Sequence, residues 1–292
     1  MVREGYRCGL PSGACALSST HASSPKAQAS ADLRAQVEDF RAETEALNKT
    51  LCSLSAHAWA RSTTFKSWAV WDVLAHLHTG NLMGLLTLND PQAYARKRED
   101  NAASGLSRTE LARQQLGDLS GEALRAAWYA DAITVCERFV DADPDVRLTW
   151  SGPGMKPRMF VAARQMETWA HGTEIYDLFK LPREHYDRLR NIATLGVRTF
   201  AWTFRNRAET VPDEVPYVAL TAPSGARWTW NDSHSRSRIE GTALDFCQVV
   251  TQVRNIADVG LSVHGESARM WMAKAQCFAG APEDPPAPGS RV

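Results

Sequence analysis

The stretch Arg164-Gln-Met-Glu-Thr-Trp-Ala-His-Gly172 places Glu167 and His171 four residues apart in a segment with helical character. Residues at positions i and i+4 share one helical face, so the carboxylate and the imidazole can point at the same spot. A second helical stretch, residues 68–77 (WAVWDVLAHL), carries His76 among apolar side chains. One histidine from one helix and a Glu/His pair from another can form a three-ligand metal site with open positions for water or substrate.

The spacing leaves the histidine of the second stretch undecided, because His78 follows His76 after two residues. At about 100° per residue, two such side chains differ in direction by about 200°, so they cannot share one target. His76 shares a face with Val73, and His78 shares one with Leu74. Either histidine can therefore be the one that faces the Glu/His pair.

A less specific reading also fits each residue by itself. His76 alone is typical of a core histidine satisfied by a hydrogen bond, and Glu167 with His171 is typical of a surface pair. Glu167, however, lies between Met166 and Trp169, where an unpaired buried carboxylate would be costly. A divalent cation would relieve that cost, which favours the metal-site hypothesis when the stretches are taken together.

The composition is that of a globular protein without a polyelectrolyte partner. The 292 residues are 44% hydrophobic and 23% charged, and 33 basic residues balance 33 acidic ones. This balance predicts no nucleic-acid or membrane-surface role, and no segment approaches the ~20 apolar residues of a membrane span. The cysteines at 52, 136, 247 and 277 sit in apolar helical contexts without C-x-x-C spacing, which predicts free thiols and a cytoplasmic location.

Apolar spacing predicts four long helices, which suggest a bundle. Between them, residues 92–106 predict a short helix plus a loop, and Ser107 with Glu110 has the pattern of a capping box. The four long helices are expected at residues 32–54, 70–88, 121–140 and 158–179.

The pattern changes after residue 183, where strand-like runs and turn signals predict a small α+β domain. The fold class is therefore mainly α with an α+β C-terminal part. Helices are expected at 184–207, 241–254 and 266–278, and strands at 215–221, 226–230 and 261–264. The predicted organisation is a disordered extension (1–30), a helical bundle (31–183), the α+β domain (184–281) and a disordered tail (282–292).

Three segments carry a resemblance to a known family. Residues 71–77 (WDVLAHL), 163–172 (ARQMETWAHG) and 241–254 (GTALDFCQVVTQVR) resemble the mycothiol-dependent maleylpyruvate isomerase-like proteins of the DinB-like metal-binding superfamily. The similarity runs from about residue 32 to residue 281, and it is strongest to a mostly actinobacterial subgroup of metal-binding proteins. The resemblance implies a DinB-like four-helix bundle followed by a small sterol-carrier-protein-like domain.

The resemblance also implies a site. It implies a divalent metal, usually zinc, on His76, Glu167 and His171, and so selects His76 over His78. It further implies a catalytic contribution from an arginine of the C-terminal domain, for which Arg254 is the candidate. Relatives often carry an acidic residue shortly after the first histidine, where this chain has Asn81, so the family reaction need not be the reaction of this chain.

The expected chemistry uses a small-molecule substrate and a low-molecular-weight thiol. Zinc lowers the pKa of a bound thiol, whose thiolate can add to an electron-poor double bond and leave again, or stay attached as an S-transfer. Two alternatives stay open. One is a thiol-independent Lewis-acid hydrolase, cyclase or tautomerase, and the other is a non-catalytic, metal-stabilised binding protein.

Overall fold

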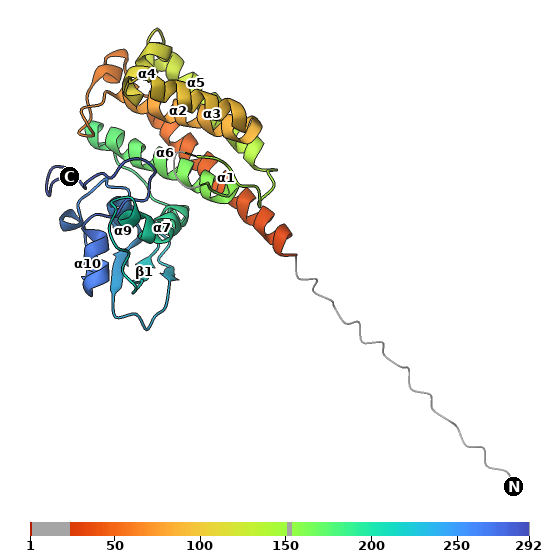
Figure 1. Cartoon of the computed structure of the whole chain (residues 1–292), viewed down its shortest axis with the longest axis vertical. Helices are drawn as coiled ribbons and strands as arrows, with labels where there is room; N and C mark the ends of the chain where they lie inside the picture. The colour runs from red at the N-terminus through yellow and green to blue at the C-terminus, as the bar shows by residue number, and fades with distance from the viewer. Residues whose placement is uncertain (2–23, 151–153, 292) are drawn as a thin grey trace.

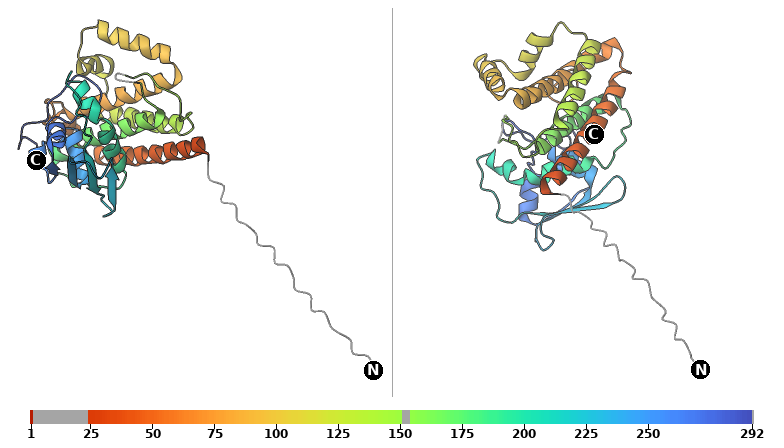
Figure 2. Two further views of the ribbon diagram at one scale, coloured as in Figure 1. Left: turned by 60° about the horizontal axis from the view of Figure 1, so that its bottom comes forward. Right: turned by 90° about the vertical axis from the view of Figure 1, so that its right-hand side faces the viewer.

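The computed structural model describes residue 1 and residues 24–150 and 154–291. The described chain forms a helical half followed by a half that contains a sheet, and the second half lies against one side of the first (Figures 1 and 2). The predicted fold class, mainly α with an α+β C-terminal part, is confirmed. None of the helices in the described part is both long and apolar enough to cross a membrane.

Four long helices make up the bundle: α1 packs against α5 and α6, and α2 packs against the same two helices. The shorter α3 and α4 lie beside α2, as Figure 1 shows. The helices of this half are α1 (Pro25–Leu51), the 3₁₀ turn η1 (Ala56–Ala60), α2 (Val70–Asn89), α3 (Pro91–Ala103), α4 (Arg108–Leu116), α5 (Gly121–Phe139) and α6 (Pro157–Phe179).

Local capping explains where several of these helices begin. Ser24 and Ser120 accept hydrogen bonds from backbone N–H groups of the first turns of α1 and α5, which satisfies donors that have no partner inside a helix. At the start of α4, Ser107 and Glu110 exchange the reciprocal hydrogen bonds of the predicted capping box. The four long helices expected from the apolar spacing are confirmed, with ends shifted by a few residues.

The first helix begins earlier than expected. The predicted extension covered residues 1–30, but Ser24 caps a helix that starts at Pro25. Residues 25–30 contain few apolar side chains, so periodicity gives no signal there, although Pro at the first position and Ala, Lys and Gln after it suit a helix. Residues 2–23, where the rest of the predicted extension falls, lie outside the described residues.

The second half contains a four-stranded mixed sheet in the order β2-β1-β3-β4. Strand β1 pairs antiparallel with β2 and parallel with β3, and β3 pairs antiparallel with β4. Its elements are α7 (Leu189–Arg198), α8 (Phe200–Arg205), β1 (Tyr217–Thr221), β2 (Arg227–Trp230), β3 (Arg238–Thr242), α9 (Ala243–Val250), η2 (Ile256–Asp258), β4 (Ser262–His264) and α10 (Glu266–Met272).

Three of these strands were expected, and β3 was missed. The helix predicted over 241–254 is in fact the end of β3 followed by the shorter α9. Residues 238–242 pair in parallel with β1, and a parallel partner is distant in sequence, so no local turn signal announces the strand. The helix predicted over 184–207 is likewise two helices, α7 and α8, which are separated at Thr199.

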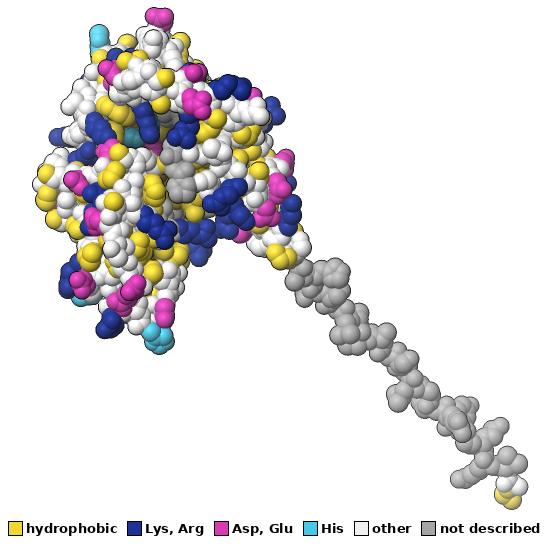
Figure 3. All heavy atoms as spheres, in the orientation of Figure 1, with side chains coloured by type: hydrophobic (Ala, Val, Ile, Leu, Met, Phe, Trp, Pro, Cys, Tyr) yellow, Lys and Arg dark blue, Asp and Glu magenta, His cyan; other side chains and the backbone are white. Residues whose placement is uncertain are grey.

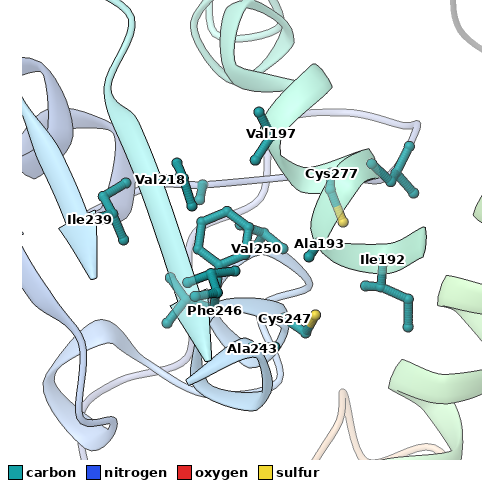
Figure 4. Packing of buried hydrophobic residues seen from close by; sticks show 14 of the residues in the cluster. Ile192, Ala193, Val197, Val218, Ile239, Ala243, Phe246, Cys247, Val250 and Cys277 are labelled. Atoms are coloured by element: carbon teal, nitrogen blue, oxygen red, sulfur yellow. The ribbon is translucent and has the colours of Figure 1, made fainter. Parts of the chain in front are cut away.

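The core of the second half forms where α7 and α9 pack together beside the sheet (Figure 4). Ile192 and Val197 of α7, Phe246 and Val250 of α9, and Val218 of β1 are buried in this cluster. The same cluster continues into α6 of the helical half. Independent domains at 31–183 and 184–281 therefore stay a prediction, because α6 contributes to the cores on both sides.

The C-terminal segment differs from the expectation of a disordered tail. Residues 282–291 are held by polar contacts, since Gln252 donates to the carbonyl of Glu283 (2.7 Å) and Asn255 donates to the carbonyl of Pro286 (2.8 Å). The run of prolines suggested disorder because it supports no helix or strand. These partners are remote in sequence, so the sequence pattern could not reveal them.

A buried ionic cluster connects α1 to the segment that joins the two halves. Glu43 of α1 binds Arg183 (2.9 Å) and Arg188 (2.6 Å) through its two carboxylate oxygens, and its side chain is only 4% exposed. Arg183 also donates to the carbonyl of Trp169 on α6 (2.9 Å). Glu43 thereby fixes the path of the chain as it leaves α6.

Replacement of Glu43 tests this role. We expect Glu43→Ala to lower the free energy of unfolding by about 3–5 kcal/mol, because the change leaves two largely buried guanidinium groups without their counter-charge. Urea unfolding followed by circular dichroism measures the effect. Glu45→Ala is the matched control, since Glu45 is exposed on the same helix and should change stability by less than about 0.5 kcal/mol. Equal effects of the two changes would contradict the assigned role.

Candidate metal centre at the junction of the two halves

The structure brings His76, Glu167 and His171 together. Nε2 of His76 lies 3.1 Å from Oε2 of Glu167, and Nε2 of His171 lies 3.4 Å from the same oxygen. One candidate ligand atom from each of the three residues lies within 4.8 Å of the other two. Three side chains from two helices thus converge on one point, and no other group of three or more His, Cys, Asp or Glu residues within ligating reach occurs among the described residues.

The two histidines of α2 point in opposite directions, which settles what the spacing left open. His76 faces α6 and Glu167, whereas Nδ1 of His78 lies 3.0 Å from Oδ2 of Asp131 on α5. The difference follows from the ~200° between residues two apart on a helix. His78 is therefore part of the contact between α2 and α5 and takes no part in the cluster.

Aromatic residues of the turn before α2 cover the histidines. The Trp68 ring stacks on His171 at a centroid distance of 5.9 Å and lies 5.4 Å from His76, and Phe65 meets His171 edge-on at 5.0 Å. The turn is closed by a backbone hydrogen bond from Thr63 to Trp68 (2.7 Å). Phe65 was missed from the sequence because residues 62–67 resemble an ordinary polar connection. Trp68 was assigned to the helical stretch 68–77, whereas α2 begins only at Val70 and Trp68 belongs to the turn before it.

Burial and hydrogen bonding set the protonation of the cluster. Burial lowers the pKa of His76 to about 4, although its hydrogen bond to Glu167 acts in the opposite direction. Burial acts to raise the pKa of Glu167, but the hydrogen bonds from His171 and His76 outweigh it and hold that pKa well below its usual value. At neutral pH the cluster thus contains a neutral imidazole beside a carboxylate anion, which are the forms that bind a metal.

A cavity of about 690 Å³ opens from the cluster toward the second half. Its wall includes the cluster, Phe65 and Trp68 on one side and residues of the 251–253 and 278–291 segments on the other. Arg291 reaches in from the C-terminal segment and binds Glu174 of α6 (3.0 Å). The volume lies within the ~300–1,000 Å³ typical of small-molecule sites.

Arg254, the arginine expected to contribute to catalysis, is not among the residues that line this cavity. Its guanidinium instead makes a two-point contact with the carboxylate of Asp177 near the end of α6 (2.8 and 2.9 Å). The arginine from the second half that does line the cavity is Arg291. Arg291 was not predicted as a site residue, because it lies in the segment that was expected to be disordered.

The fold and the cluster define a class of protein: a helical bundle joined to a small sheet-bearing half, with two histidines and a carboxylate converging at the junction. A sequence model named "Mycothiol maleylpyruvate isomerase N-terminal domain" matches residues 20–176. This match covers more than half of the chain, and the chain belongs to that family. The resemblance found in the sequence is thereby confirmed.

Relatives and solved structures extend the comparison. Two uncharacterised proteins of Mycobacterium tuberculosis, from strains CDC 1551 / Oshkosh and H37Rv, are each 34% identical to this chain over 246 residues, which cover 84% of this chain and 96% of theirs. The crystal structure of the mycothiol-dependent maleylpyruvate isomerase matches with a TM-score of 0.49 and 14% identity over 79% of this chain and 92% of that one. A mutant of the same enzyme matches with a TM-score of 0.49 and 15% identity.

The two histidines of α2 provide a matched pair for testing metal binding. We expect His76→Gln to retain much less zinc than the wild type after zinc loading and dialysis, because it removes one of the three side chains that converge at the candidate site. His78→Gln should retain the zinc content of the wild type, since His78 faces Asp131. Elemental analysis of the three purified proteins measures the difference. Equal zinc contents in the two variants would contradict the ligand assignment.

The lowered pKa of His76 predicts a pH dependence of stability in the metal-free protein. The unfolded chain protonates His76 near its ordinary pKa of 6.5, whereas the folded chain does so only near 4. Between these values the unfolded state binds more protons, so stability should fall as the pH is lowered from 6.5 to 4.

Urea unfolding across this range, in wild type and His76→Gln, measures the contribution of His76. The wild type should lose more stability on acidification than His76→Gln does. The control is His57→Gln, at an exposed position in η1, which should follow the wild type. If wild type and His76→Gln lose stability in parallel, His76 is not buried in its neutral form.

Proposed function

We propose that this protein is a metal-dependent enzyme that uses zinc and a low-molecular-weight thiol for isomerisation of, or S-transfer to, an activated double bond in a small-molecule substrate. The observation that carries the proposal is the convergence of His76, Glu167 and His171 at the wall of the cavity between the two halves. Membership of a family whose model bears the name of a mycothiol-dependent isomerase supports the choice of reaction class.

The residues of the cluster fit zinc. Two imidazole nitrogens and one carboxylate oxygen are ligands that zinc prefers, and three protein ligands are the number typical of catalytic zinc, which keeps a further position open. The cavity borders the cluster, so that position can be reached by a small molecule. When bound there, zinc supplies a Lewis acid that lowers the pKa of a thiol and polarises a substrate oxygen.

The side chains around the cluster have roles that follow from their contacts. Trp68 and Phe65 cover the His171 ring, which restrains its orientation and excludes water from that side of the cluster. Oε2 of Glu167 lies within 3.4 Å of Nε2 of both histidines, so in the metal-free protein the same nitrogen of each ring faces the centre, and a bound metal would take the place of these contacts. These contacts hold the cluster in place before any ligand arrives, which lowers the cost of ordering it on binding.

Two further charged residues, Glu174 and Arg291, line the cavity. Glu174 is 3% exposed; burial raises its pKa, and the pairing with Arg291 opposes that shift. The Arg291 guanidinium also lies 5.3 Å from the centroid of the Phe65 ring. Arg291 therefore links the C-terminal segment to the aromatic cover of the cluster, and we assign it the role of closing the cavity on that side.

Arg254 stays a prediction as a contributor to activity. Because it binds Asp177 of α6 and does not line the cavity, any contribution must act through the position of α6 rather than through contact with substrate. The proposed location is the cytoplasm. A reducing compartment keeps a low-molecular-weight thiol available, and it suits the four free cysteines described here, of which three are buried and Cys52 is exposed.

Thiol dependence is the decisive test of the proposed reaction. Zinc-loaded protein is incubated with mycothiol, bacillithiol or glutathione and an activated enoate, and the thioether and the isomerised product are measured by mass spectrometry. We expect turnover with at least one thiol, and a loss of at least about 100-fold in Glu167→Gln, because a ligand that fixes the metal and both imidazoles is removed.

Glu137→Gln, at an exposed position of α5, is the matched control and should retain activity. Turnover without any thiol would replace the proposal with Lewis-acid chemistry. Absence of both bound thiol and turnover with all three thiols would contradict it.

A further inference from the structure

A second cavity, of about 530 Å³, adjoins the cluster from the side of α3 and α4. Its wall includes His76 and Glu167, so the cluster lies where this cavity meets the one that opens toward the second half. Residues of α2, α3, α4 and α6 and the 279–281 segment enclose it. Nothing in the proposed reaction so far uses this space.

Four cationic side chains line this second cavity, namely Lys97, Arg98, Arg108 and Arg164, and Glu167 is the only carboxylate among its lining residues in the described chain. Among the described residues, none of these four cations forms an ion pair, since no carboxylate oxygen lies within 4.0 Å of their nitrogen atoms. Figure 3 shows Lys and Arg side chains gathered around a hollow of the helical half in which a histidine is visible. The cavity therefore carries an excess of positive charge.

Arg164 is the deepest of these cations. It is only 3% exposed, and it donates from Nε to Oδ1 of Asn81 (3.2 Å) and from Nη2 to the carbonyl of Leu77 (3.2 Å). Its guanidinium lies flat against the backbone at Gly80, where a Cβ atom would come within 2.6 Å of Nη1. Both contacts are with neutral groups. A buried guanidinium that contacts only neutral groups is costly, and an acidic ligand would relieve that cost.

The residue beside the Arg164 guanidinium is a neutral amide, Asn81, and not a carboxylate. It is fully buried, and its Nδ2 atom has no hydrogen-bond partner among the described residues. A carboxylate of the same shape would neutralise Arg164 and would leave no unpaired N–H group. The neutral amide instead leaves the charge of Arg164 available, with Glu167 as the acidic group that acts on it through space.

The apolar part of the wall suits a small organic molecule. Tyr94 and Trp150 stack at a centroid distance of 5.8 Å, and both line the cavity. An anion-binding site with an aromatic wall is the arrangement that recognises an acidic group attached to a carbon skeleton.

We propose that this second cavity is a subsite for the acidic group of a small organic anion, a carboxylate or a phosphate, which binds Arg164 at its floor and Lys97, Arg98 and Arg108 at its mouth. The remainder of that molecule extends past His76 and Glu167 into the first cavity. The placement of its reactive part beside the cluster rests on the proposed function. Binding of the anion does not, because the cations belong to the chain itself.

Isothermal titration calorimetry of succinate and of inorganic phosphate into the full-length protein tests the proposal. The protein is first freed of metal with EDTA, and the EDTA is then removed by gel filtration. We expect saturable binding of one anion per chain. Asn81→Asp should weaken it by at least about tenfold, since the new carboxylate occupies Arg164, and Arg164→Gln should weaken it to a similar extent.

Two further variants keep the outcome interpretable. Arg96→Gln, at an exposed position of α3 outside the cavity, is the matched control and should bind within about twofold of the wild type. Arg108→Gln, at the mouth, should weaken binding even if both buried variants fail to fold. The proposal is overturned if the wild type shows no saturable binding, or if the variants that fold among Asn81→Asp, Arg164→Gln and Arg108→Gln bind as well as Arg96→Gln.

Zinc content, measured on the same preparations after reloading, separates this proposal from the proposed function. Anion binding by a protein that takes up no zinc would support the subsite and contradict the metal-dependent reaction. Zinc uptake and thiol-dependent turnover without anion binding would have the opposite meaning. A preference for phosphate over succinate, or the reverse, identifies which acidic group the subsite takes.

Discussion

The burial of α6 on all of its sides is the constraint on which the rest of the structure depends. Phe160 and Val161 pack into the core of the bundle, whereas Met166 and Trp169 of the same helix are part of the core of the second half. A helix with apolar residues around its whole circumference has to be enclosed. The two halves enclose α6 together, so they cannot separate without exposing it.

The enclosed helix carries a polar cluster at one place along its length. Glu167 and His171 face the gap between α2 and the second half, where His76 arrives from α2 and Trp68 and Phe65 cover the rings. The carboxylate remains ionised there because two imidazoles hydrogen-bond to it, and the cavities on either side give small molecules access. The same packing that holds the halves together thus creates an enclosed, charged centre that small molecules can reach.

The bundle and the cluster could be predicted because their signals are local or periodic. The i, i+4 spacing of Glu167 and His171 places them on one face in any helix, and apolar spacing identifies the four long helices. Strand β3 could not be found in this way, because its pairing with β1 depends on a partner about twenty residues away. Arg254 was predicted to lie at the site but does not line the cavity, for a similar reason. Sequence position does not show which carboxylate an arginine will bind, and Arg254 binds Asp177.

The sequence by itself determined the helical bundle, the change to an α+β pattern after it, the family, and the two side chains that share a face of α6. Spacing alone left His76 and His78 open, the resemblance favoured His76, and the tertiary structure placed His76 beside them. Only the tertiary structure decided that Arg291 lines the first cavity and that Arg164 lies in the second without an ion-pair partner. The features that the sequence determined depend on spacing along the chain, because the helical repeat sets the direction in which each side chain points from its helix. The features that only the tertiary structure decided depend on how the helices are rotated and packed against one another. That arrangement is determined by contacts between side chains far apart in sequence.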